Sequence, residues 1–469
     1  MSRSINDQPI RAIAAAIRDG KTTAQAVVDE AVARHDGAGA ALDAYKLWDG
    51  ERASGEAAAA DALLAGGLDV GPLMGLPISI KDLYGVTGTP TFAGTPKALP
   101  DDWTREGPVV KALRDHMGVV MGKTHTVEFA FGGVGTNPHW PNPRNPWDAD
   151  HHRACGGSSS GAGVSLCEGS AFIAMGSDTG GSVRIPATLT GNVGLKISAG
   201  RWSTDGIVPL STTFDTPGPL TRSVEDAIVA FAVIDPAHDD VEALYQRLDG
   251  AAIGDVRIGV AVSHFWDDCA PGVAEAVRGA LGELEKAGAR MADLDLPEAP
   301  QAREMVFHRH LFGVEAMSFI NEQYPDRLET MDPNVKYRMD ISKDVSATAY
   351  YTALRQLHDL ARRADERLRH IDVLVSPTTP GPIARLDQIT EPTTYNESNA
   401  LMTHNTFPIN LLELCAVTIP VGLDGDGMPV GLQMIARHGE EERLLAVALA
   451  AERVLGTSRE RLGTPPMCA

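Results

Sequence analysis

The chain has 469 residues, of which 43% are hydrophobic and 22% charged, and its formal net charge is −21. This acidity argues against nucleic acid and against an anionic membrane surface as partners, because both are bound by clustered Lys and Arg. The chain is long enough for a large buried core, arranged as two or three domains or as one α/β core with an inserted lobe.

The predicted elements alternate between helices and strands, which indicates an α/β fold. Residues 5–66 show apolar positions at spacings of three and four and predict three helices, with a turn at Asp19-Gly20. Next comes a strand at 78–80, and then a helix followed by a strand within 106–124. Further strands are expected at 256–262, 290–294 and 372–376, with a hairpin of 417–421 and 430–434; further helices are expected at 224–233, 273–287, most of 301–370 (one of them long, 347–370) and 441–455.

Two segments stand out by composition. Residues 132–206 are dense in Gly, Ser and Pro without being repetitive, which indicates tight turns and close backbone approach around a site. Residues 377–410 are rich in Thr, Pro and Asn and are expected to be a loop, either an active-site wall or a connector. The link between the helix 224–233 and the strand 256–262 is polar.

The cysteines and the N-terminus bear on location. Five widely spaced cysteines without a CxxC pair fit neither a disulfide framework nor a structural zinc site. The N-terminus, MSRSINDQPIRAIAAAIRDG, has polar residues where a signal peptide needs an unbroken apolar stretch. No run approaches the roughly 18–20 apolar residues of a transmembrane helix. A cytoplasmic location is therefore expected.

One lysine and two serines could carry chemistry together. Lys81 follows an apolar run and should be buried, and burial favours the neutral amine that acts as a general base near pH 7. Ser158 lies in GGSSSG, and Ser182 lies in GSDTGGSVRIP. Gly180 and Gly181 allow a turn that points successive N–H groups to one place, as an oxyanion hole requires. Singly, each feature has an ordinary structural interpretation: a surface lysine, or a Gly-Ser connector.

Three other motifs are incomplete. The segment GVVMGKT lacks the first glycine of a P-loop. His151-His152 has no third ligand at a suitable spacing, so no metal site is expected. The GSSSG segment matches the nucleophile elbow of α/β-hydrolases around Ser159, with Asp372 and His404 as formal partners, but the residues before it are a poor strand.

Several blocks of the sequence resemble the amidase signature family. The block GGSSSGAGVSLCEGSAFIAMGSDTGGSVRIPATLTGNVGLKIS resembles the family signature, and GPLMGLPISIKD resembles its lysine motif. The likeness continues through NPRNPWD, DGIVPLSTTFDTPGPLTRSVEDA, DVLVSPTTP and MPVGLQMIA, and is weakest at 230–370. The spacing between Ser158 and Ser182 is also that of the family. Ser160 stands where many members have glycine.

The resemblance implies a fold and a domain organisation. The fold is α/β, with a central mixed sheet of about eleven strands flanked by helices. A single domain is expected over 1–469, in four parts: a helical N-terminal segment (1–70), a catalytic signature core (71–225), a more variable helical lobe (226–370) and the C-terminal part of the core (371–469).

The resemblance also implies roles for individual residues. Ser182 would be the nucleophile, Ser158 the bridging serine with a cis peptide bond, and Lys81 the base. Gly132 or its neighbour Gly133 would offer a backbone carbonyl to the substrate amide, next to Ser158. The oxyanion hole would consist of the backbone N–H groups of Thr179, Gly180, Gly181 and Ser182.

Supporting residues are expected around this set. Ser159 and Asp178 would lie behind the reacting groups, and Arg184 is expected to tie the loop down rather than to reach the pocket. Either an apolar pocket or core packing would explain Phe129, Phe131 and Trp140.

The implied function is hydrolysis of a C–N bond in a small amide, with carbamates, hydrazides and esters as further candidates. It needs no cofactor and no metal, and similar proteins commonly form homodimers. The alternative is the glutaminase (A-type) subunit of a tRNA-dependent amidotransferase. In FDTPGP, around Asp215, Thr216-Pro217 stands where that subgroup has glutamine before Gly-Pro, which favours a standalone amidase.

Overall fold

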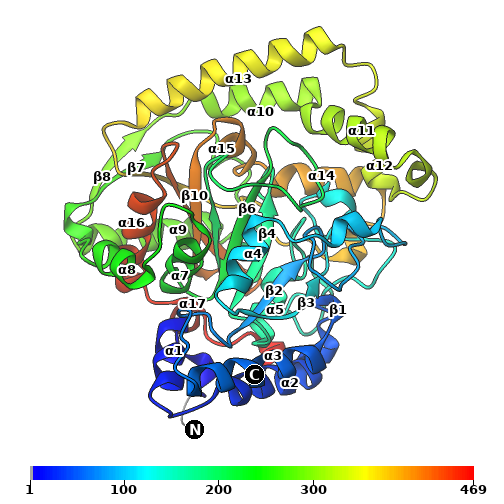
Figure 1. Cartoon of the computed structure of the whole chain (residues 1–469). Helices are drawn as coiled ribbons and strands as arrows, with labels where there is room; N and C mark the ends of the chain where they lie inside the picture. Colours follow the sequence, from blue (N-terminus) through cyan, green and yellow to red (C-terminus); the bar gives the residue numbers. More distant parts are fainter. Residues whose placement is uncertain (1–3) are drawn as a thin grey trace.

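A computed structural model of the chain describes residues 4–469. At its centre lies one mixed sheet of eleven strands, in the order β1-β3-β2-β4-β6-β5-β10-β11-β9-β7-β8, with helices around it (Figure 1). The expectation of an α/β fold with about eleven strands is confirmed.

The strands are β1 (Tyr45–Trp48), β2 (Pro77–Lys81), β3 (Val119–Thr124), β4 (Ile173–Asp178), β5 (Val193–Lys196), β6 (Thr216–Thr221), β7 (Arg257–Ala261), β8 (Arg290–Leu294), β9 (Val373–Pro377), β10 (Cys415–Leu423) and β11 (Pro429–Ala436). The α-helices are α1 (Ile10–Arg18), α2 (Ala24–Asp36), α3 (Gly50–Ala65), α4 (Pro108–Asp115), α5 (Ala162–Glu168), α6 (Arg184–Leu189), α7 (Val224–Ile234), α8 (Val241–Asp249), α9 (Val273–Lys286), α10 (Glu298–Arg309), α11 (Leu311–Gln323), α12 (Pro333–Asp340), α13 (Ala347–Leu368), α14 (Pro392–Met402), α15 (Phe407–Leu411), α16 (Glu441–Leu455) and α17 (Ser458–Leu462).

The strand pairing brings the ends of two parallel strands together. Strand β2 runs parallel to β3 on one side and to β4 on the other. In this register Ile80 lies opposite Met175, so Lys81 at the end of β2 lies beside the last residues of β4. Ligands bind at the carboxyl ends of strands in α/β sheets. At this end of β2 and β4 lie Lys81 and the start of the turn that contains Ser182.

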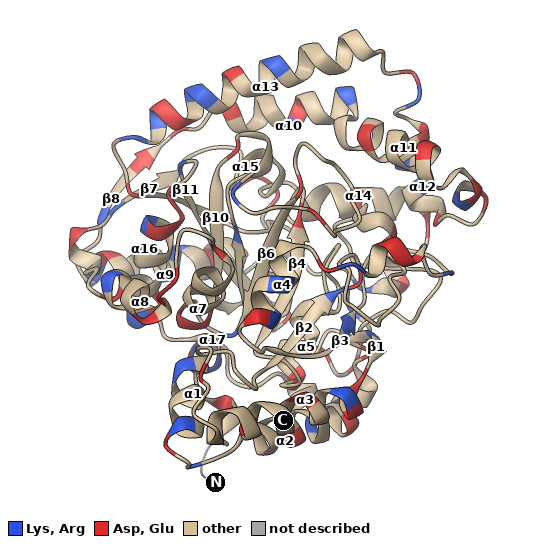
Figure 2. Cartoon of the chain, viewed as in Figure 1, with Lys and Arg blue, Asp and Glu red and all other residues tan. Residues whose placement is uncertain are grey.

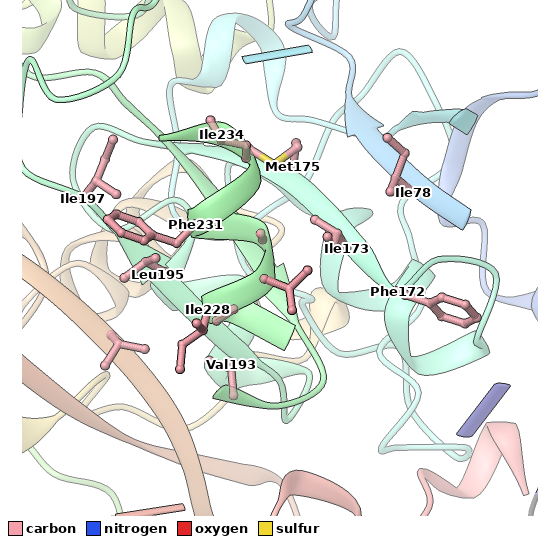
Figure 3. Packing of buried hydrophobic residues seen from close by; sticks show 14 of the residues in the cluster. Ile78, Phe172, Ile173, Met175, Val193, Leu195, Ile197, Ile228, Phe231 and Ile234 are labelled. Carbon is pink, nitrogen blue, oxygen red and sulfur yellow. The ribbon is translucent and has the colours of Figure 1, made fainter. Parts of the chain in front are cut away.

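Helix α7 shows how the apolar pattern builds the core (Figure 3). Its sequence VEDAIVAFAVI is apolar almost all round, and nearly every residue is buried. Ile228 and Phe231 are fully buried, and each such side chain contributes about 1.5–3 kcal/mol to stability. The side chains that α7 packs on come from β4 and β5, among them Ile173, Met175, Val193 and Leu195.

The N-terminal segment contains the three predicted helices and one strand that was not predicted. Helices α1 to α3 lie together at one end of the molecule (Figure 1), and the Thr23 side chain caps α2 by accepting from the Ala26 N–H at 3.0 Å. Strand β1 pairs antiparallel with β3 at the edge of the sheet. The pattern of apolar residues does not predict β1, because this strand has only four residues and all of them are half-buried, so neither of its faces is distinctly apolar.

Two other segments expected to lack regular structure contain helices. Helix α8 lies in the polar link, and α14 and α15 lie in the segment 377–410 that was expected to be a loop. The prolines that suggested a loop, Pro392 and Pro408, occupy the first turns of α14 and α15, where the missing N–H has no helical partner to lose.

Charged residues lie mainly on the outer helices, with α13 carrying bands of both signs from Arg355 to its C-terminal end (Figure 2). The expected long helix at 347–370 is this α13, whose buried side includes Leu357 and Leu360. Three lysines are nevertheless fully buried near the sheet: Lys81, Lys123 and Lys196. Within residues 4–469 the structure has no helix with the length and apolarity needed to span a membrane.

Candidate active site

Lys81 lies at the end of β2 with no exposed surface. Its Nζ is 2.7 Å from Ser158 Oγ and 3.0 Å from Ser177 Oγ. Burial lowers the pKa of Lys81 to about 7, although the negative charges of Asp215 and Asp178 act to raise it. The amine is therefore a base that is partly unprotonated at neutral pH.

The serine run next to Lys81 divides into a reactive position and a supporting one. The peptide bond between Gly157 and Ser158 is cis. The Ser159 hydroxyl donates to the Ser182 carbonyl at 2.6 Å and accepts from the Ser177 N–H at 3.4 Å. Ser159 is fully buried and joins the Ser158 turn to the Ser182 turn, so it is not available as an elbow nucleophile.

The formal partners of that elbow are also engaged elsewhere. Asp372 pairs with Arg257 and Arg443 at 3.0 Å each. The ring of His404 faces the His264 carbonyl at 3.0 Å. An α/β-hydrolase triad centred on Ser159 is thus not assembled.

Ser182 lies in the turn between β4 and α6 and borders a cavity. Two glycines precede it for steric reasons. A Cβ on Gly180 would lie 2.1 Å from the Phe407 ring, and Gly181 has φ of +127° and faces Thr406 Oγ1 at 2.2 Å from a Cβ. Larger residues would force this turn away from the helices that pack on it.

Asp178 organises the same turn from behind. Its carboxylate accepts from the Gly181 N–H at 2.7 Å and from the Val183 N–H at 3.2 Å. Of the four N–H groups expected to form the oxyanion hole, that of Gly181 is thus engaged by Asp178 in this structure. Of the expected donors, Thr179, Gly180 and Ser182 border the cavity.

Arg184 fills the structural role expected of it. It has no exposed surface, and its guanidinium contacts Asp178 at 3.0 Å and Gln433 and Asn410 at 2.6 Å each. Burial alone would raise the pKa of Asp178, but the charge of Arg184 holds it well below its ordinary value. The pair therefore stays ionised and fixes the shape of the Ser182 turn.

Gly132 and Gly133 both border the cavity, but only one has a carbonyl to spare. The Gly133 carbonyl accepts from the Gly157 N–H at 2.8 Å, and its N–H donates to Asn399 Oδ1 at 2.7 Å. No hydrogen bond from the described residues reaches the Gly132 carbonyl. Gly132 is accordingly the better placed of the two to accept from a substrate.

The cavity beside Ser182 has a volume of about 130 Å³ and is mostly apolar. The segment 377–410 forms part of its wall. Of the three aromatic candidates only Phe131 borders it, because Phe129 is buried in the core and Trp140 packs against Phe92 and Lys46. The lining residues are Ala130, Phe131, Gly132, Gly133, Thr179, Gly180, Ser182, Leu210, Val306, Phe307, His310, Phe312, Gly313, Arg338, Ile341, Asn399, Thr403 and Phe407.

Sequence reasoning missed three polar residues of the site. Ser177, the second partner of Lys81, carries no motif of its own but lies on β4 two residues after Met175, the partner of Ile80. The Asp215 carboxylate accepts from the Thr179 hydroxyl and from the Leu210 N–H at 2.9 Å, and burial raises its pKa to about 6. Arg338 comes from α12, in the part of the chain with the weakest family resemblance.

Comparison with known proteins decides the family. A sequence model described as Amidase matches residues 26–445. The chain belongs to the amidase family. The expected amidohydrolase activity is confirmed at this level: this amidase hydrolyses a C–N bond.

Individual relatives cover nearly the whole of this amidase. A 2-amino-5-chloromuconic acid deaminase of Comamonas testosteroni is 45% identical over 97% of both chains. The A-type subunit of a glutamyl-tRNA(Gln) amidotransferase from Koribacter versatilis is 30% identical over 96% of this chain and 99% of its own. A crystal structure of an amidase, 31% identical, superposes with a TM-score of 0.85 over 96% of this chain and all of its own.

Proposed function

We propose that this amidase forms an acyl-enzyme on Ser182, with Lys81 as base and Ser158 as relay, and that its substrate carries a carboxylate bound by Arg338. The observation that carries the first part is the buried contact of Lys81 Nζ with Ser158 Oγ at 2.7 Å, made by an amine whose pKa is lowered to about 7. The Ser159 bond to the Ser182 carbonyl keeps the two serine turns together.

The chemistry follows from this arrangement. Neutral Lys81 takes the Ser158 proton while Ser158 takes the Ser182 proton, and Ser182 Oγ bonds to the substrate carbonyl carbon. The N–H groups of Thr179, Gly180 and Ser182 stabilise the oxyanion, and one such donor contributes about 3–4 kcal/mol in other enzymes. The proton then passes back to the leaving nitrogen as the C–N bond breaks. Water cleaves the ester by the same relay and regenerates Ser182.

The second part rests on the surroundings of Arg338. No carboxylate of the described residues lies within 4 Å of its guanidinium. Its Nε is buried without a hydrogen-bond partner, and the guanidinium carbon lies 5.1 Å from the Phe131 ring centroid and 5.5 Å from that of Tyr395. One Nη donates to the Phe131 carbonyl and the other to Asn396 Oδ1 at 3.5 Å, which leaves three of the five N–H groups unused. A cation at a cavity wall with donors left over is suited to a planar anion.

A second donor lies beside this cation. The Tyr395 hydroxyl is buried without a partner, and a Cβ on Gly132 would lie 3.1 Å from Tyr395 Oη and 3.2 Å from an Arg338 Nη. The Arg338 guanidinium and the Tyr395 hydroxyl thus both lie next to Gly132, which lines the cavity. Most of the remaining wall is apolar. A substrate with a carboxylate at one end, a short apolar middle and a C–N bond at the other end fits this pattern.

Support for the carboxylate comes from the relative that is 45% identical, whose name states that it deaminates 2-amino-5-chloromuconic acid, a dicarboxylic acid. The nitrogen of that acid is an amine on an alkene carbon and not an amide, so the name bears on the carboxylate and not on the acyl-enzyme. The second candidate function, a glutaminase subunit of a tRNA-dependent amidotransferase, is favoured by relatives about a third identical, such as that of Lacticaseibacillus casei (32%). Free glutamine also carries a carboxylate, so the two functions must be separated by activity.

The test uses substrates matched in length. The purified full chain is given hexanamide and the monoamide of adipic acid, which share a six-carbon chain, and separately free glutamine, and ammonia release is followed. We expect the monoamide of adipic acid to have a kcat/KM about 30-fold or more above that of hexanamide, as for one desolvated charge pair. Ser182→Ala should abolish all turnover.

Two variants separate the two parts of the proposal. Arg338→Met should remove the preference for the carboxylated substrates and leave hexanamide turnover within a few fold. The control Arg355→Met, at an exposed position of α13, should change neither. An equal loss on both substrate types would refute the role of Arg338 alone, and turnover by Ser182→Ala would refute the acyl-enzyme alone. Release of ammonia from glutamine and from nothing else would favour the glutaminase function.

A further inference from the structure

Three potential metal ligands meet next to the segment between α14 and α15 that borders the cavity. His264 and Asp267 lie in the loop after β7, and His404 lies between α14 and α15. One ligand atom from each lies within 4.8 Å of the others. The two imidazole rings are stacked, with centroids 4.2 Å apart and planes at 23°. None of these side chains takes part in the proposed reaction.

We propose that His264, Asp267 and His404 bind one divalent transition-metal ion of the Zn²⁺, Co²⁺ or Ni²⁺ class. His264 is only 9% exposed, and its Nε2 is buried without a hydrogen-bond partner. A buried polar atom left unpaired costs about 1–3 kcal/mol, which a ligand at this atom would offset.

The other two donors are also available. The His404 Nε2 lies 3.0 Å from the His264 backbone carbonyl, a bond that only a protonated Nε2 can donate. That tautomer leaves the lone pair of Nδ1 for a metal, and a second ring nitrogen held by a carbonyl is the usual support of a metal-binding histidine. The exposed side chain of Asp267 makes no hydrogen bond among the described residues, so its carboxylate can move to close the shell.

The charges around the cluster suit a dication. Arg303 is the cation that lies near both histidines. The carboxylates of Asp267 and Asp268 outnumber it, and Asp268 acts to raise the pKa of Arg303. Neutral imidazoles with one carboxylate favour Zn²⁺, Co²⁺ or Ni²⁺ over Ca²⁺ or Mg²⁺.

The ion would join two segments that shape the cavity. Thr403 and Phe407, on either side of His404 in the chain, line the cavity. Thr406 donates to the Gly180 carbonyl at 2.7 Å. A metal bridge from His404 to the loop after β7 would thus hold this wall in place without touching the reacting atoms, and its effect would be on stability.

The test measures binding directly. The full chain without an affinity tag is dialysed against chelator and titrated with ZnCl₂ in a calorimeter, and bound Co²⁺ is followed by its visible absorption. We expect one ion per chain, and a higher unfolding temperature with the ion because it binds only the folded state. His264→Ala should weaken binding about 100-fold or more, and Asp267→Ala about tenfold or more.

The variants are chosen to separate this site from surface binding. Asp267→Ala changes an exposed side chain and should fold like the wild type. His308→Ala removes a histidine that lies 3.5 Å from Glu304 on the exposed face of α10, and should leave the affinity unchanged. Absence of binding by the wild type, or an affinity unchanged in either His264→Ala or Asp267→Ala, would overturn the proposal.

Discussion

The titration of Lys81 should set the pH dependence of this amidase. The base acts only when it is unprotonated, so kcat/KM should rise with pH and level off above the Lys81 pKa of about 7. Half of the amine is neutral at that pH, about a tenth at pH 6 and about a hundredth at pH 5. We therefore expect a fall in kcat/KM of about fiftyfold from pH 7 to pH 5.

The same lowered pKa has a consequence for stability. An unfolded lysine titrates near its ordinary value of 10.5, so below pH 7 the folded protein bears the full cost of burying the ammonium, about 5 kcal/mol. This cost declines as the pH rises from 7 toward 10.5. Lys81→Met removes it but leaves Ser158 and Ser177 without a partner, a loss of about 2–4 kcal/mol together. The variant should be more stable than the wild type by about 1–3 kcal/mol at pH 6.

The assay combines the two readouts. Initial rates of ammonia release are measured from pH 5 to pH 9 on one substrate, and unfolding in urea is followed at pH 6. Lys81→Met should be inactive at every pH, and Lys343→Met, at an exposed position, should match the wild type in both. A wild-type kcat/KM that is constant between pH 5 and pH 8, in protein that stays folded, would refute the assignment of Lys81 as base.

Two further predictions concern the groups around the base. Asp215→Asn removes a negative charge that raises the Lys81 pKa, so the acid limb of the kcat/KM profile should move to lower pH; a move to higher pH would contradict this electrostatic role. Gly180→Ala places a Cβ 2.1 Å from the Phe407 ring and should lower kcat by about 10²–10³-fold through a displaced oxyanion donor, measured with circular dichroism as a check on folding. Phe407→Ala in the same chain should restore part of that kcat, and no rescue would show that the clash is not the cause.

The reacting residues could be predicted because their signal is local. Lys81, Ser158 and Ser182 each lie in a short block of consecutive residues that also contains the glycines or the apolar strand needed to position the side chain. The long periodic elements were predictable for a similar reason: α7, α13 and α16 each carry several turns of buried apolar positions.

Strand β6 shows why some of the sheet could not be predicted. It contains Pro217 and Pro219, which argue against a central strand because proline has no N–H to donate. The structure accommodates them because β4 pairs along all of β6, whereas β5 pairs with it only at Leu220 and Thr221. At its two prolines, β6 therefore has a paired strand on one side only. Which of its residues lack a second partner depends on the length of the neighbouring strand β5.

The polar end of the cavity and the histidine cluster could not be predicted either. Arg338 and Tyr395 lie far apart in the chain and meet only because α12 and α14 pack together. His264 and His404 are also far apart in the chain, and no sequence motif links them. Spacing in the sequence carries no information about such pairs, because the packing of helices decides which of their side chains meet.

The division of the cavity between distant stretches of chain has an evolutionary consequence. The groups assigned to bond breaking fall between Lys81 and Ser182, whereas most of the opposite wall comes from residues 306–407. Asn399, Thr406 and Phe407 also hold the turns of Gly133 and Gly180, so they are tied to the first stretch. Mutations among the wall residues from 306 to 341 are free of these contacts and can accumulate more easily. A lineage could acquire new substrates by drift in these helices while inheriting its reaction intact, and a library randomised only at the wall residues of 306–341 would sample new specificities while the contacts of Asn399, Thr406 and Phe407 with the catalytic turns are kept.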